Sequence, residues 1–176
     1  MRAHKKAPAS GQLAKGALVN NHTANTTTYT RRRAALHEAG HAISHQAHGI
    51  RVKSVEVSQD GPHWLGWTAT EKQPDVSQAS DLRSDVSVAS GLMCGHVAEM
   101  LHAAPVPKGH NLDEIGRALH VLSIIMDKGG QMDLYAYPVD LLERNRAALI
   151  GLADNLMLTR KIGGHRLRYL LREVVP

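Results

Sequence analysis

The sequence predicts a mainly α-helical domain of the α+β class, with a small β-hairpin after its first helix. The chain has 176 residues, 43% of them apolar, which suits one ordinary globular domain. Aromatic residues make up only 3% and phenylalanine is absent, so the core must be built from aliphatic residues and methionine. That composition favours helices. Helical spacing of apolar residues also dominates the chain from Asp75 onward.

Residues 1–30 are expected to form a flexible basic tail in front of a folded domain over 31–176. The tail is rich in basic and small polar residues and poor in large apolar ones. The formal net charge of the chain is +5, and a basic tail can touch nucleic acid. Its charges are not interleaved with aromatic residues that could stack on bases, so a solvated tail is the favoured interpretation.

The cysteine count and the hydropathy pattern narrow the class of protein further. The single cysteine, Cys94, excludes an internal disulfide and a zinc site built from cysteines. No apolar stretch approaches the roughly 20 residues that cross a bilayer, and the first residues do not resemble a secretory signal. A cytoplasmic protein without a membrane partner is therefore expected.

The order of elements follows from caps, turns and periodicity. Thr28 or Thr30 caps a helix over 31–48 that Gly49 closes. Two strands, IRVKSVEVS and HWLGWTATE, flank the turn QDGP and form a hairpin. The remaining expectations are two helices within 77–103, an amphipathic helix over 112–128, a long helix over 139–161 and a short one over 165–175.

The first helix carries the motif HEAGH, which has the spacing of a metal site. His37 and His41 are one turn apart, so both imidazoles project from one face and can hold one Zn²⁺ at roughly 2.0–2.1 Å. Glu38 is rotated about 100° around the axis, beside the metal, where it can accept a proton from a metal-bound water. Zinc lowers the pKa of that water to about 7. The pattern therefore predicts a hydrolytic zinc centre.

The third zinc ligand is less clear from the residues. His45 lies two turns from His37, too far along the axis to share one ion comfortably. Glu56 and Glu71 are possible but lie in or beside the predicted strands. Asp113 stands at the start of the helix over 112–128, where a ligand and a helix-dipole partner or N-cap are both consistent with its position.

Several segments resemble, in the same order, the peptidase domain of the FtsH family of zinc proteases. ALHEAGHAI is similar to its zinc helix, and the segment ending in LGWTAT is similar to its "LGYT" strand. SGLMCGHVAEML, KGHNLDEIGRA and the C-terminal segment from DLLERNRAAL onward resemble the helices that follow. The likeness covers residues 31–173.

The resemblance implies a helical zinc-peptidase fold in which His37, His41 and Asp113 bind Zn²⁺ and Glu38 is the catalytic base. The family's Asn-Asp-Leu stands here as Asn111-Leu112-Asp113, one position out of register. Glu99 matches an acidic position of the family near the site. It is the alternative third ligand, or a partner that orients a histidine.

The implied function is a metalloendopeptidase that hydrolyses unfolded or flexible proteins and peptides. The family joins this domain to an AAA+ ATPase and forms hexamers, but no phosphate-binding loop is present here. The resemblance therefore implies that a separate AAA+ ATPase acts as a partner and that the chain forms a homo-oligomer. The alternative is a non-enzymatic zinc-binding scaffold or adaptor that retains the peptidase fold.

Overall fold

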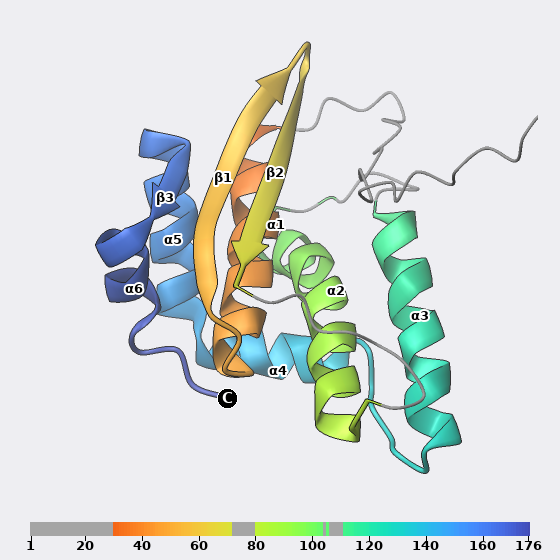
Figure 1. Ribbon diagram of the computed structural model, residues 1–176. Helices are drawn as coiled ribbons and strands as arrows, with labels where there is room; N and C mark the ends of the chain where they lie inside the picture. Colours follow the sequence, from red (N-terminus) through yellow and green to blue (C-terminus); the bar gives the residue numbers. More distant parts are fainter. Residues whose placement is uncertain (1–29, 72–79, 104, 106–110) are drawn as a thin grey trace, which may run out of the picture.

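The computed structural model describes residues 30–71, 80–103, 105 and 111–176 (Figure 1). In chain order the described residues form α1 (Arg31–Ala47), β1 (Val52–Asp60), β2 (His63–Thr70), α2 (Leu82–His102), α3 (Leu112–Asp127), α4 (Ala136–Arg144), α5 (Arg146–Thr159), β3 (Lys161–Gly163) and α6 (Gly164–Leu171). This mostly helical arrangement with one small sheet confirms the predicted α+β class. The predicted tail lies, apart from Thr30, outside the described residues.

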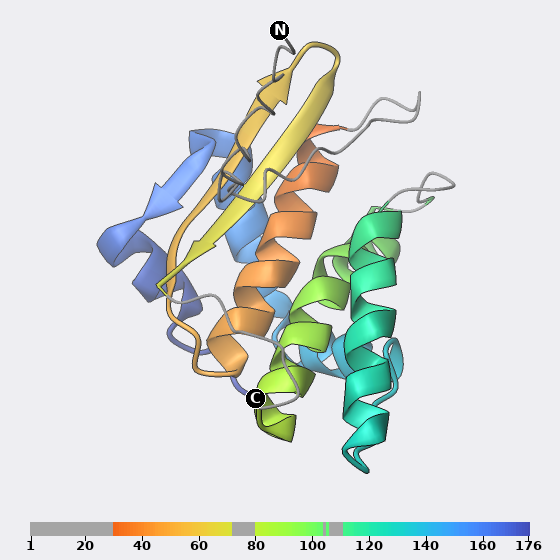
Figure 2. The ribbon, with the colours of Figure 1, turned by 45° about the vertical axis from the view of Figure 1, so that its right-hand side comes forward.

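Helix α1 lies between the β1–β2 hairpin and helix α2, and it packs against β1, β2, α2 and α5 (Figures 1 and 2). The Thr30 hydroxyl accepts a hydrogen bond from the backbone N–H of Arg33, one of the groups that a helix start leaves without an internal partner. Gly49 follows the helix with a φ of +75°, a conformation that glycine adopts without steric cost. The helix predicted over 31–48 is confirmed to within one residue.

The predicted hairpin is confirmed, and a third strand extends it into a sheet of order β2–β1–β3. β1 pairs antiparallel with both neighbours, so β2 is an edge strand. The ladder shifts register between Val52 and Ser54, which explains why Val52 and Val55 are both buried although three positions separate them. β3 has only three residues, too few to produce a periodic signal in the sequence.

The expectation of two helices within 77–103 is wrong, because residues 82–102 form the single helix α2. Gly91 and Gly95 lie inside it, although glycine weakens a helix by about 1 kcal/mol relative to alanine. Both glycines lie where α2 meets α1, and a Cβ at Gly95 would stand 2.7 Å from the His37 ring. Close packing between the two helices therefore outweighs the local preference.

The expectation of one long helix over 139–161 is also wrong, because the segment divides at Asn145 into α4 and α5. Asn145 is buried, and its side-chain amide donates to the backbone carbonyls of Leu141 and Val175. Its Oδ1 accepts from the N–H of Val175. Asn145 therefore connects the corner between the two helices to the C-terminal segment by hydrogen bonds. Local sequence patterns do not predict this contact, because the two segments are far apart in the chain.

Two apolar clusters hold the helices together. The larger one joins α1, β1 and one part of α2 to α4, α5 and α6, and the smaller one joins α2 to α3 around Met93 and Ile125. The amphipathic helix predicted over 112–128 is confirmed as α3.

A buried ion pair follows this helix: Lys128 donates to the fully buried carboxylate of Asp85 over 2.6 Å. This ion pair ties the end of α3 to the start of α2.

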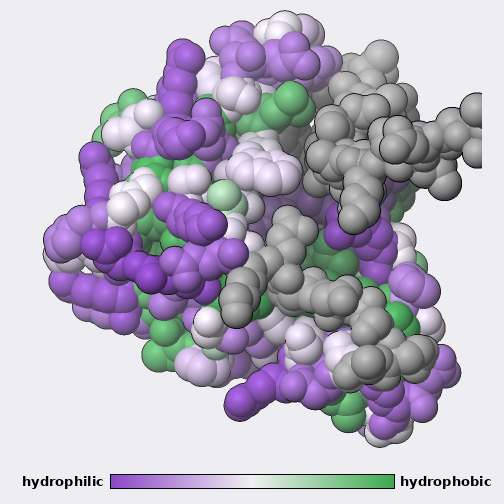
Figure 3. Space-filling view, in the orientation of Figure 1, coloured by the Kyte–Doolittle hydropathy of each residue, from purple (hydrophilic) through white to green (hydrophobic). Residues whose placement is uncertain are grey.

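Hydrophilic side chains gather over the side of the molecule formed by β3, α5 and α6 (Figure 3). Basic residues on this side form ion pairs with acidic neighbours, Lys161 with Glu56 and Arg172 with Glu173. Within the part of the chain that the structure describes, no helix is both long and apolar enough to cross a lipid bilayer.

Candidate metal centre

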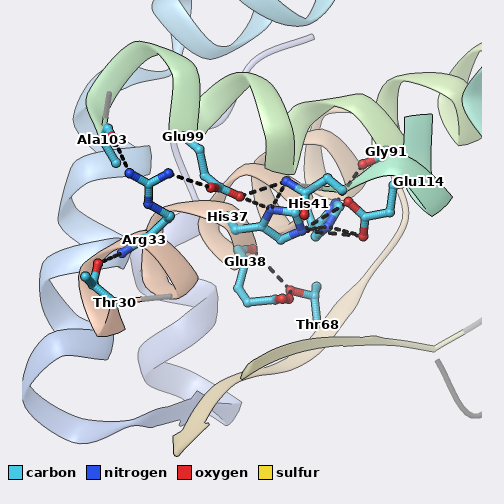
Figure 4. A network of polar contacts seen from close by, with 11 residues as sticks. Thr30, Arg33, His37, Glu38, His41, Thr68, Gly91, Glu99, Ala103 and Glu114 are labelled. Atoms are coloured by element: carbon cyan, nitrogen blue, oxygen red, sulfur yellow. Dashed lines mark hydrogen bonds and ion pairs between the residues drawn. The ribbon is translucent and has the colours of Figure 1, made fainter. Parts of the chain in front are cut away.

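Three side chains of α1 gather where this helix meets α2 and β2 (Figure 4). His37, Glu38 and His41 place their ligand atoms within 4.8 Å of one another. One helical turn separates the two histidines, so both rings project from the same face, with their Nε2 atoms 2.9 Å apart. His37 and Glu38 are each only 6% exposed. The structure therefore brings the predicted histidine pair and its neighbouring carboxylate together in a nearly enclosed place.

The ring of His37 is held by Glu99 of α2. Its Nδ1–H donates to Oε1 of Glu99 over 2.7 Å, and the Glu99 side chain is fully buried. Asn111 donates to the same oxygen over 2.9 Å, and the Arg33 guanidinium lies 3.8 Å from the other. Glu99 contacts the opposite nitrogen from the one that faces His41. This geometry favours a partner that orients the histidine, one of the two roles expected for Glu99.

The ring of His41 is held by a backbone carbonyl, because its Nδ1 lies 2.7 Å from the oxygen of Gly91. A carbonyl oxygen only accepts, so Nδ1 carries the proton, and a neutral ring then turns the lone pair of Nε2 toward His37. The carboxylate of Glu99 imposes the same tautomer on His37. The two Nε2 atoms therefore face one another across 2.9 Å, and a positive charge beside them would relieve the repulsion between their lone pairs.

Glu114 brings a third acceptor to this pair from the first turn of α3. Its Oε2 lies 3.2 Å from Nε2 of His37, and its Oε1 lies 3.3 Å from Nε2 of His41. Two imidazoles and one glutamate are a donor set that catalytic zinc sites use. Tetrahedral ligands bound at about 2.0–2.1 Å stand about 3.3 Å apart, close to the separations here. The residues present therefore fit a zinc ion.

Asp113, the predicted third ligand, is not brought to the histidines. Its side chain is exposed, and a step of one residue turns a helix by about 100°. The face of α3 that packs on α2 carries Ala118, Val121 and Ile125. Four residues before Ala118 on that face is Glu114. The periodicity of the helix therefore indicates Glu114, whereas the resemblance to the Asn-Asp-Leu motif indicates Asp113.

The electrostatics of the three groups favour added positive charge. Burial lowers the pKa of His37, but the carboxylates of Glu114 and Glu99 outweigh burial and raise that pKa well above its usual value. Burial likewise lowers the pKa of His41, and Glu114 more than reverses the effect. Burial raises the pKa of Glu114, yet the two histidines bring it far below the usual range. A divalent cation held by these groups would satisfy the same demand for charge.

Gly95 of α2 keeps open the space in front of the two Nε2 atoms. A Cβ added there would stand 2.7 Å from Nε2 of His37 and 2.7 Å from Nε2 of His41. Carbon and nitrogen atoms do not pack so closely, since optimal contacts are about 3.5–4.0 Å. Any side chain at position 95 would therefore occupy the place where the two nitrogens and Glu114 converge.

Glu38 extends from α1 toward the edge strand β2 (Figure 4). Thr68 donates from Oγ1 to Oε2 of Glu38 over 2.7 Å. Gly66 lies against the same side chain, because a Cβ there would stand 2.3 Å from Oε1. The carboxylate is thus held between β2 and the histidine pair. The sequence alone does not indicate Thr68 or Gly66, because their contacts with Glu38 depend on how the hairpin packs against α1.

The other candidate ligands lie elsewhere. Glu56 and Glu71 each form an ion pair with a basic side chain at the surface, away from the histidine pair. His45 lies beside Gly91, and burial lowers its pKa to about 4. Cys94 is buried, as expected, and burial raises the pKa of its thiol to about 11.

Comparison with known proteins adds no identification. No protein-family model matches this chain, and no curated protein matches it. The interpretation of the metal centre therefore depends on its geometry and on the motifs of the sequence.

Proposed function

We propose that the protein is a zinc-dependent metalloendopeptidase in which His37, His41 and Glu114 hold Zn²⁺ and Glu38 acts as the general base. The proposal rests on one observation: two histidine Nε2 atoms and a carboxylate converge within 2.9–3.3 Å of one another. Three protein ligands with a fourth position left open are typical of catalytic zinc. A hydrolytic centre also needs a general base that is not a ligand, and Glu38 supplies a carboxylate close to the three ligands.

The chain's own residues have distinct roles in the proposed reaction. Bound zinc would supply a water of lowered pKa and polarise the peptide carbonyl. Glu38 accepts a proton at its carboxylate and returns it to the leaving amine. Glu99 and the carbonyl of Gly91 hold the histidines through Nδ1, which keeps both Nε2 atoms available as ligands. The enclosure of these groups strengthens their electrostatic interactions.

The proposed substrate is an unfolded or flexible protein segment. His37 and Glu38 are 6% exposed, so the surface of a folded domain would not reach them easily. β2 is an edge strand beside Glu38, and an extended segment can pair with such an edge through its backbone. Folded substrates would then need a separate ATPase that unfolds them, a partner that the resemblance to FtsH peptidases also suggests.

Removal and return of the metal tests the proposal. The purified full-length chain is expected to bind about one zinc ion and to cleave casein or an unstructured peptide. Chelation is expected to abolish cleavage, and zinc added in equal amount to the protein is expected to restore it. The readouts are metal content by elemental analysis and fragments by mass spectrometry. Zinc binding without cleavage of any unfolded substrate would support the scaffold alternative, and failure to bind added zinc would contradict both.

Glu114→Gln is expected to weaken zinc binding far more than Asp113→Asn. Loss of a partner that only orients a ligand costs roughly 10- to 100-fold in metal affinity, and loss of a charged ligand is expected to cost more. Asp113→Asn is a matched control, because it removes the same charge one residue earlier from an exposed position. Competition titration against a chelating dye measures both affinities. Equal losses, or a larger loss for Asp113→Asn, would contradict Glu114 as the ligand.

A further inference from the structure

The edge strand β2 contributes one hydroxyl to the candidate site, that of Thr68. We propose that Thr68 is a positioning residue for the general base: its hydroxyl holds Oε2 of Glu38 and so fixes the orientation of the carboxylate that exchanges the proton. The inference rests on the proposed function, in which Glu38 is that base. Thr68 lies 30 residues after Glu38, outside the motif that carries the zinc chemistry.

The hydroxyl proton of Thr68 has two acceptors within reach, and the carboxylate is the better one. Oγ1 lies 2.7 Å from Oε2 of Glu38 and 3.1 Å from the backbone oxygen of the same residue. A hydroxyl donates one proton. The backbone oxygen belongs to the interior of α1, where the N–H four residues later serves it. A hydrogen bond to a carboxylate is also roughly twice as strong as one between neutral groups.

Gly66 completes a two-point contact between β2 and Glu38. Positions 66 and 68 lie on the same face of the strand, the face toward α1. A Cβ at Gly66 would stand 2.2 Å from Cγ of Glu38 and 2.3 Å from Oε1, so the side chain lies directly on the strand backbone. The backbone of β2 at Gly66 thus prevents the Glu38 carboxylate from moving toward the strand, and the hydrogen bond from Thr68 fixes the rotation of the carboxylate. A base displaced by about 1 Å can lose roughly 100-fold in rate.

Thr68→Val removes the hydroxyl and keeps the size of the side chain. It is expected to lower kcat for peptide cleavage by roughly 10- to 100-fold, with KM and zinc content unchanged. Thr68→Ser keeps the hydroxyl and is expected to retain kcat to within about threefold of wild type. Thr70→Val makes the same change two residues along the same strand and is expected to leave kcat unchanged.

The Glu38→Gln background separates a positioning role from a general structural one. If Thr68 acts through the base, Thr68→Val is expected to lower the residual rate of Glu38→Gln by less than about twofold. A loss in that background as large as in wild type would overturn the proposal. So would full kcat in Thr68→Val.

A measurement of stability tests the contact without any need for peptidase activity. Thr68→Val is expected to raise the unfolding equilibrium constant about tenfold more in wild type than in Glu38→Ala, where the acceptor is gone. Urea titrations of the four proteins give this coupling. Absence of coupling would overturn the inference. If Thr68→Val and Glu38→Ala were coupled in a protein that binds zinc but cleaves no peptide, the contact between Thr68 and Glu38 would stand and the proposed function would be refuted.

Discussion

Glu38→Gln is expected to leave zinc bound while lowering kcat for peptide cleavage by roughly 10²- to 10⁴-fold. Glutamine keeps the size of the side chain and an oxygen that can accept from Thr68, but an amide cannot accept a proton and return it as a carboxylate does. General base catalysis contributes a rate factor of that order. Initial rates on an unstructured peptide, together with zinc content and thermal stability of the same samples, measure the effect.

Glu56→Gln is the matched control for this change. Glu56 lies on β1, partly exposed and paired with Lys161, so its loss is expected to leave the rate within about twofold of wild type. Equal activity of Glu38→Gln and wild type would exclude Glu38 as the base. Loss of zinc together with activity would show that Glu38 is a ligand.

Gly95→Ala is expected to abolish zinc binding in a protein that still folds. The added methyl carbon would stand 2.7 Å from Nε2 of both His37 and His41. Neither ring can turn away at small cost, because Glu99 and the carbonyl of Gly91 hold their Nδ1 atoms at 2.7 Å. Affinity is expected to fall by more than about 100-fold, beyond the cost of losing an orienting partner. Cleavage is expected to disappear with the metal.

Gly91→Ala is the control for the same substitution on the same helix. Its Cβ would meet only the edge of the His45 ring, at 3.4 Å, and the carbonyl that holds His41 stays in place. Alanine also favours the helix over glycine by about 1 kcal/mol. Circular dichroism is expected to show that both variants are folded, and zinc titration is expected to show a loss of affinity in Gly95→Ala but not in Gly91→Ala. Wild-type zinc affinity in Gly95→Ala would contradict the location of the metal centre.

Local patterns in the sequence were sufficient to predict those helices and strands whose formation depends mainly on residues close by in the chain. The Thr30 cap and the regular spacing of α1 predicted that helix, and the turn between two β-rich runs predicted the hairpin. The apolar period of α3 predicted its extent closely. The same patterns failed at α2 and at Asn145. There the outcome depended on close packing against α1 and on hydrogen bonds to a segment 30 residues away.

The sequence by itself determined that one helix carries two histidines and a carboxylate with the spacing of a metal site, because positions one and four apart on a helix have a set spatial relation. Only the tertiary structure decided which carboxylate faces the pair and which side chains orient it. Those choices place Glu114, Glu99 and Thr68 against α1 across 77, 62 and 30 residues of chain. They depend on how α3, α2 and β2 pack against one helix, and packing between distant segments leaves little trace in local periodicity.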